Sequence, residues 1–204
     1  MFVCYAASAI RFGYCPPIFG LDGMHLKTKY RGILLAATAT DANGLLFPLA
    51  SAVVDAENDG NWFWFIQLLR CAIEQHAPQF RIPRALSFVS DRQKGLIEGV
   101  ERVFPNSPHG YCLHHLHKNM WKNFKHPKLK TFLWQAADAI TEADFNAALE
   151  ELRKISPLAV EWFLRHTHPR YWAECYFPGQ YLKDHGIPEL RHYGCSREAN
   201  PCNV

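Results

Sequence analysis

Two aspartates, Asp22 and Asp91, each follow a short apolar run and come directly before a change of chain direction. The runs read "IFGL" (18–21) and "ALSFVS" (85–90), and each has the length of a buried strand. In open α/β sheets, ligands bind beyond the carboxyl ends of the strands, where the strand order reverses. We therefore expect both carboxylates to lie at one end of a sheet.

The two carboxylates become neighbours if the strand before Asp91 pairs in parallel with the strand before Asp22. Two ionised carboxylates at that spacing repel one another unless a proton or a cation lies between them. Carboxylate oxygens are ligands that suit Mg²⁺ or Mn²⁺, and paired ions of this kind serve phosphodiester chemistry. A second interpretation stays open, in which Asp22 caps a turn and Asp91 is the N-cap of the following helix.

The elements that would position these residues follow from the apolar pattern. Runs at 32–40 and 45–55 flank an Asn-Gly turn, which predicts a hairpin. The spacing predicts helices over 58–76 and 92–105, and a brief strand followed by a basic helix over 109–124. The order β-β-β-α-β-α-β-α predicts an α/β fold with a mixed five-stranded sheet and helices on its faces.

Basic side chains gather in one part of the chain, although the net charge is only +3. Residues 105–135 contain five lysines, five histidines and no acid. Such a one-signed stretch is typical of nucleic-acid binding, and the alternative is a solvated helix face. The candidate phosphate contacts are Lys27, Lys29 and Arg31, which alternate along the hairpin, Arg92 and Lys94 beside Asp91, and Lys118 and Lys122 in the basic helix.

Two stretches carry a resemblance to a known family. They read "LDGMHLKTKYRGILLAATATDANGLLFPLASAVVDAENDGNWFWFIQLL" and "FVSDRQKGLIEGVERVFPNSPHGYCLHHLHKNM". Together they resemble the transposase domain of Mutator-like elements (MULEs) over roughly residues 18–124. The resemblance implies a ribonuclease-H-like fold and a DDE-type site of two aspartates and a glutamate, with Asp22 and Asp91 as the first two acids and as ligands of Mg²⁺ or Mn²⁺.

The resemblance also implies a function, namely cut-and-paste DNA transposition by strand cleavage and strand transfer. It implies homo-oligomers that act on transposon ends and target DNA, and a nuclear location. The leading hypothesis is a transposase catalytic domain in a fragment or incomplete copy. The alternative is a domesticated or degenerate DNA-associated or interaction protein without cleavage activity.

The third acid of such a site is the open question. The family carries its glutamate after a helical insertion, and here the chain reads "YGCSREANPCNV" at that point. Glu198 is the nearest carboxylate and Glu189 is a weaker candidate; otherwise the acid falls past Val204. The chain is then either truncated before this acid or a decayed copy.

The change of pattern along the chain also predicts its domains. Residues 127–176 carry helical spacing only, and the following tail is low in apolar residues. We expect a catalytic core at 1–125, a helical insertion at 126–178 and a loop-like tail at 179–204.

Cys112 and His115 form a Cys-x-x-His pair where the family has one. Two zinc ligands fit that spacing, but no second pair at finger spacing follows, so we expect a structural role, or a place beside the metal site, rather than zinc. The seven cysteines show no paired spacing, which is typical of reduced thiols in an intracellular protein. No stretch has the character of a transmembrane helix, so we expect a soluble protein without a membrane partner.

Overall fold

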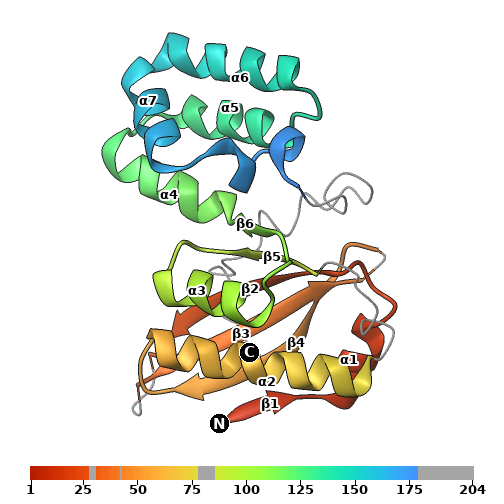
Figure 1. Cartoon of the computed structure of the whole chain (residues 1–204). Coiled ribbons are helices and arrows are strands. Elements are labelled where there is room, and N and C mark those ends of the chain that lie inside the picture. Colours follow the sequence, from red (N-terminus) through yellow and green to blue (C-terminus); the bar gives the residue numbers. More distant parts are fainter. Residues whose placement is uncertain (28–30, 42, 78–85, 179–204) are drawn as a thin grey trace, which may run out of the picture.

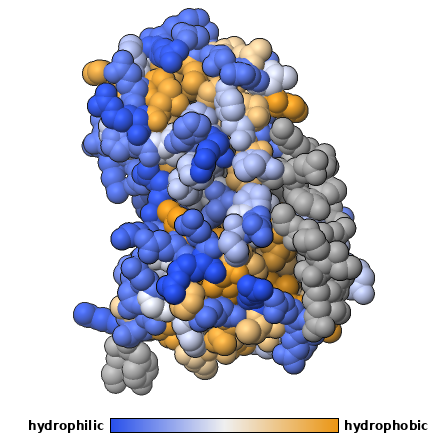
Figure 2. Space-filling view, viewed as in Figure 1, coloured by the Kyte–Doolittle hydropathy of each residue, from blue (hydrophilic) through white to orange (hydrophobic). Residues whose placement is uncertain are grey.

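The structure, a computed structural model, describes residues 1–27, 31–41, 43–77 and 86–178. Figure 1 shows two layers. One is a β-sheet with helices against it, and the other is a group of helices stacked beyond one edge of that sheet. Figure 2 shows the same view in space-filling form, with hydrophilic side chains over much of both layers.

The described residues form one sheet of six strands in the order β1-β4-β3-β2-β5-β6. The strands are β1 (Phe2–Cys4), β2 (Ile18–His25), β3 (Ile33–Thr40), β4 (Leu46–Val54), β5 (Ser87–Ser90) and β6 (His109–Tyr111). Neighbours from β1 to β2 pair antiparallel, whereas β5 lies parallel to β2 and β6 lies parallel to β5. The predicted hairpin is confirmed as β3 and β4, and the predicted parallel pairing of β5 with β2 is confirmed as well.

The predicted five-stranded sheet lacks one strand that the described residues form, β1 at the edge. Its three residues are too few to show the alternation of side chains that predicts a strand. Its position depends on contacts with residues far away in the sequence. Phe2 pairs with Ala52 of β4, and its ring centroid lies 5.7 Å from that of Phe65. The short helix α1 (Ala6–Phe12), which follows β1, was not predicted either.

Strand β2 is also longer than predicted. The apolar run indicates a strand that ends before Asp22, but β2 continues to His25. The extension exists because β3 supplies a ladder partner at every position, up to the pairing of His25 with Ile33. Asp22 therefore lies inside a strand and not at its tip.

The first hydrophobic cluster lies between the sheet and helices α1, α2 (Asp59–His76) and α3 (Lys94–Val103). Asn58 caps α2, since its Oδ1 accepts the Asn61 N–H at 2.8 Å. The apolar face predicted for α2 is buried as expected. It consists of Trp62, Phe65, Ile66, Leu69 and Ile73.

The second hydrophobic cluster lies in the helical layer. Its helices are α4 (Leu113–Asn123), α5 (Pro127–Asp138), α6 (Glu142–Ile155) and α7 (Pro157–His166), followed by the 3-10 helices η2 (Pro169–Tyr171) and η3 (Glu174–Tyr176). Thr141 is the N-cap of α6 as predicted, and its Oγ1 accepts the Asp144 N–H at 3.1 Å. Leu116 and Met120 of α4 pack into this cluster, so α4 belongs to the helical layer by its packing.

None of the helices that the structure describes has the length and apolar character needed to cross a membrane.

The contact between α2 and α3 leads to a stability prediction. A Cβ on Gly95 would lie 2.2 Å from Asp59 Oδ1 and 2.5 Å from Asp59 Cα, so the backbones of the two helices would have to separate. We expect Gly95→Ala to lower the free energy of unfolding by about 1–3 kcal/mol, measured by urea denaturation.

Gly60→Ala is the matched control for this variant. Gly60 lies in the first turn of α2, and a Cβ there meets nothing closer than Asn58 Oδ1 at 3.5 Å. Its urea midpoint should equal or exceed that of the unchanged chain, because alanine favours a helix over glycine. Equal midpoints for both variants would mean that α2 and α3 do not touch at Gly95.

Candidate functional site

The parallel pairing of β2 with β5 sets the relative position of the two candidate acids. The last matched pair is Leu21 with Ser90, so Asp22 and Asp91 are the next residues along the two chains. Neighbouring strands lie about 4.8 Å apart, a spacing that one or two cations can bridge between carboxylates. Both aspartates are half-buried. The structure therefore places the two acids that the sequence singles out directly after the last matched residues of two neighbouring parallel strands.

Asp22 has a rigid setting. It lies inside β2 and pairs with Ala36 of β3, so the interpretation of Asp22 as a turn cap is wrong. Phe19 and Leu21 point into the first hydrophobic cluster. Because successive side chains of a strand alternate between faces, Asp22 points to the opposite face of the sheet.

Asp91 lies in a turn. Its Oδ1 accepts the backbone N–H of Gln93 at 2.9 Å, which is the hydrogen bond of an Asx turn. The N-cap of α3 is Gln93, whose Oε1 accepts the Leu96 N–H at 2.6 Å. The interpretation of Asp91 as the N-cap of α3 is therefore wrong by two residues, because the Asx turn comes before the helix.

A groove of about 700 Å³ opens beside Asp91, and we call it the basic groove. Its walls come from the loop that enters α3 and the first turns of α3, from the end of β6 and one side of α4, and from the end of α7 and the chain that follows it. Its ionisable side chains among the described residues include one acid, Asp91, against the cations Arg92, Lys118 and Lys122 and the histidines His115, His166 and His168. A concave surface with this excess of positive charge favours phosphate.

Arg92 joins the two layers at this groove. Its Nη1 donates to the backbone oxygen of His166 at 2.8 Å and to Thr167 Oγ1 at 3.2 Å. These two acceptors are uncharged, so neither of them neutralises the guanidinium. Arg92 thus positions the end of α7 and still contributes to the field that a phosphate would meet.

The other predicted phosphate contacts do not line the basic groove. Lys94 lies on α3 and forms an exposed ion pair with Glu98, with 3.6 Å between Nζ and Oε1. Lys27 and Arg31 are exposed near the end of β2 and the start of β3. Lys29 and both candidates for the third acid, Glu198 and Glu189, lie outside the described residues.

The Cys-x-x-His pair lies where β6 leads into α4. Cys112 is the N-cap residue of α4, its backbone N–H donates to the Ser90 oxygen at 2.6 Å, and its side chain is buried with Ile18 and Val89. His115 lines the basic groove. Within the described ranges, no three His, Cys, Asp or Glu side chains are grouped so that they could hold a metal ion.

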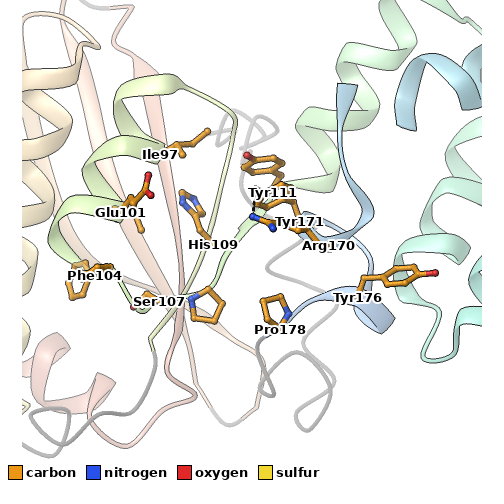
Figure 3. Close-up of a pocket in the computed structure, with 13 residues that line it drawn as sticks. Ile97, Glu101, Phe104, Ser107, His109, Tyr111, Arg170, Tyr171, Tyr176 and Pro178 are labelled. Carbon is orange, nitrogen blue, oxygen red and sulfur yellow. Dashed lines mark hydrogen bonds between the residues drawn. The ribbon is translucent and has the colours of Figure 1, made fainter. Parts of the chain in front are cut away.

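Sequence reasoning missed a second cavity, which we call the aromatic pocket. It has a volume of about 500 Å³, and its walls include His109, Tyr111, Arg170 and Tyr171 (Figure 3). Nothing in the sequence pattern places residues 170–178 against β6. The two segments approach closely at Gly110 of β6, where a Cβ would lie 3.2 Å from the Tyr171 backbone oxygen.

His109 is held beneath this pocket by Ser90. The Ser90 hydroxyl donates to the Asp91 backbone oxygen at 2.7 Å, which leaves His109 Nε2 as the donor in its 2.7 Å contact with Ser90 Oγ. Burial lowers the pKa of His109 to about 4, because the charged imidazolium loses its hydration there. His109 is thus a neutral ring at physiological pH.

The low pKa of His109 predicts a sensitivity to acid. The unfolded chain binds a proton at His109 near pH 6.5, whereas the folded chain resists it until about pH 4. The free energy of unfolding should therefore fall as the pH drops through this window, by on the order of 2–3 kcal/mol for this residue. Burial also lowers the pKa of His117 to about 4, which adds to the loss.

His109→Gln removes the titrating ring and should reduce the difference in urea midpoint between pH 7.5 and pH 4.5. The control is His126→Gln at an exposed position, which should keep the steep pH dependence of the unchanged chain. An undiminished loss of stability in His109→Gln would show that this ring titrates normally.

Comparison with known proteins identifies the family of this chain. The family model described as the MULE transposase domain matches residues 18–119. The match begins with β2, contains both aspartates, and ends within α4 after Lys118. No curated protein matches the chain. Because the family model spans half of the chain, the chain belongs to the MULE transposase domain family.

Proposed function

We propose that this chain is the catalytic domain of a DNA transposase that cleaves and transfers DNA strands with a divalent cation. The observation that carries the proposal is the register of β2 and β5, in which Asp22 and Asp91 directly follow the last matched pair. The basic groove beside Asp91 adds a surface for the substrate, whose phosphates would lie near Asp91. Membership of the MULE family agrees with both observations.

The proposal extends to a ribonuclease-H-like fold. In support, β4, β3 and β2 form an antiparallel unit, and β5 and β6 continue it in parallel on the other side of β2. The acids thus lie where the strand order reverses, which is the usual place for a ligand in an α/β sheet. In this assignment β1 is an additional edge strand, residues 1–125 are the catalytic core, and 126–178 are a helical insertion.

The residues fit a hard divalent cation by their chemistry. Two carboxylates are oxygen ligands, and a cation between them relieves their repulsion. Asp22 and Asp91 would hold Mg²⁺ or Mn²⁺, with Glu198 proposed as the third acid. Bound there, the ion supplies a Lewis acid for the oxygens of a phosphodiester.

The chain's own groups have separate tasks in this proposal. The Gln93 N–H orients the Asp91 carboxylate, and β3 holds Asp22 in the sheet. Arg92, Lys118 and Lys122 attract the phosphates of the strand and position them along the basic groove.

Catalysis can be tested with supercoiled plasmid and Mn²⁺. The unchanged chain should nick the plasmid, and Asp22→Asn or Asp91→Asn should each slow nicking by roughly a hundredfold or more, because a neutral amide holds the ion weakly. Glu198→Gln should have the same effect if Glu198 is the third acid. Asp138→Asn, at an exposed position on α5, is the control and should nick normally.

A chain that binds DNA but never nicks it would contradict this enzymatic proposal. That result would favour the alternative, a domesticated or degenerate DNA-associated protein that keeps the fold without cleavage.

DNA binding can be tested separately through its salt dependence. The double variant Lys118→Gln/Lys122→Gln removes two cations from the basic groove. The slope of log Kd against log salt on a random-sequence duplex should become shallower by about 2, since each phosphate contact contributes about 0.9. Lys154→Gln on α6 lies outside the groove lining and should keep the full slope. Equal slopes for all three proteins would contradict the proposal that DNA binds in the basic groove.

A further inference from the structure

The basic groove and the aromatic pocket are neighbouring cavities. Ile97, Tyr111 and Tyr171 line both of them. The two cavities differ in character. The groove carries Arg92, Lys118 and Lys122, whereas the pocket is lined mainly by aromatic and proline rings with one carboxylate and one guanidinium.

A stacked pair of tyrosines forms one wall of the pocket. The rings of Tyr111 and Tyr171 lie 4.6 Å apart between centroids, at an angle of 19°. The Arg170 guanidinium lies 4.5 Å from the Tyr171 ring centroid and also donates to the Tyr171 hydroxyl at 2.6 Å. Figure 3 shows these three side chains together on one side of the cavity, with Ile97 and Glu101 of α3 on the other.

The backbone fixes this wall in place. The Tyr171 N–H donates to the His168 oxygen at 3.1 Å, and the Tyr171 backbone oxygen lies against Gly110 of β6. Because the platform is already formed, a flat ligand that stacks on it does not have to order the tyrosines first.

The polar groups of the pocket suit an uncharged planar ligand rather than a phosphate. Burial keeps His109 neutral, so the imidazole offers no positive charge. The Glu101 carboxylate repels anions but is able to accept hydrogen bonds from N–H groups of a ligand, and the Arg170 guanidinium is able to donate to its ring nitrogens and carbonyl oxygens. Hydrogen-bonding groups around an aromatic platform are the features by which proteins bind an extruded or unpaired base.

We propose that the aromatic pocket receives an unpaired nucleobase of the DNA strand whose phosphates lie in the basic groove. The base stacks on the Tyr111–Tyr171 platform, with Arg170 and Glu101 at its edge. The inference rests on the proposed function in one respect, that DNA occupies the basic groove. The volume of about 500 Å³ lies within the range of about 300–1,000 Å³ that is usual for small-ligand sites.

The test uses duplex DNA with one unpaired 2-aminopurine, in EDTA so that no cleavage occurs. The same duplex with an abasic site at that position lacks only the base. We expect the unchanged chain to bind the bulged base roughly tenfold more tightly than the abasic duplex, and to quench the 2-aminopurine fluorescence by stacking.

Variants at Tyr171 separate stacking from folding. Tyr171→Ala should remove both the affinity difference and the quenching, whereas Tyr171→Phe should keep them because the ring remains. Tyr14→Ala is the control, since Tyr14 is 82% exposed and lines neither cavity. Arg170→Gln, at an exposed position, should weaken the preference without disturbing the core.

Equal affinity of the unchanged chain for the bulged and abasic duplexes would overturn the inference. So would a Tyr171→Ala variant that keeps the full preference for the base. Either result leaves DNA binding by the basic groove intact. A chain that binds neither duplex even at low salt would instead overturn the proposed function together with the inference.

Discussion

The parallel contact between β2 and β5 is the constraint on which the rest of the structure depends. It joins two segments separated by the whole β3–β4 hairpin and α2, and buried aromatic rings hold it in register. Phe19 pairs with Phe88, and their ring centroids lie 4.5 Å apart. A slip by one residue would turn Phe88 out of the core and would also move Asp91 away from Asp22. Core packing and the position of the acids are therefore a single requirement.

Much of this arrangement can be predicted from the sequence because its signals are local. The Asn-Gly turn predicts the hairpin, and the spacing of Trp62, Phe65 and Ile66 predicts the buried face of α2. The adjacency of Asp22 and Asp91 needs one further step, which is the rule that places ligands where strand order reverses. The exact setting of each acid does not follow. The extension of β2 depends on partners in β3, and the cap of α3 depends on Gln93.

The features that could not be predicted arise from contacts between distant segments. The chain leaves the sheet at Cys112, passes through four helices and returns at Tyr171 to lie against Gly110. No pattern of apolar residues in the sequence predicts that the chain returns to the sheet at this point. The return of the chain nevertheless forms both cavities. Arg92 contacts the end of α7 at the basic groove, and Tyr111 stacks on Tyr171 at the aromatic pocket. Without these contacts, each cavity would lack one of its walls. Lys118 and Lys122 of α4 line one groove only because the chain returns to the sheet in this way. Lys94 does not line the groove and instead forms an ion pair with Glu98.

The two acids differ in the mechanical support they receive. Asp22 is carried by a strand that is hydrogen-bonded to β3 beyond its position, so its backbone is stiff. Asp91 follows the last residue of β5, and two side-chain hydrogen bonds shape its turn: Asp91 Oδ1 accepts the Gln93 N–H, and the Ser90 hydroxyl donates to the Asp91 backbone oxygen. When the separation of the two carboxylates changes, the turn at Asp91 moves more easily than the strand that carries Asp22. In the proposed reaction, Asp91 and the loop that enters α3 would therefore adjust, and Asp22 would be the fixed reference point.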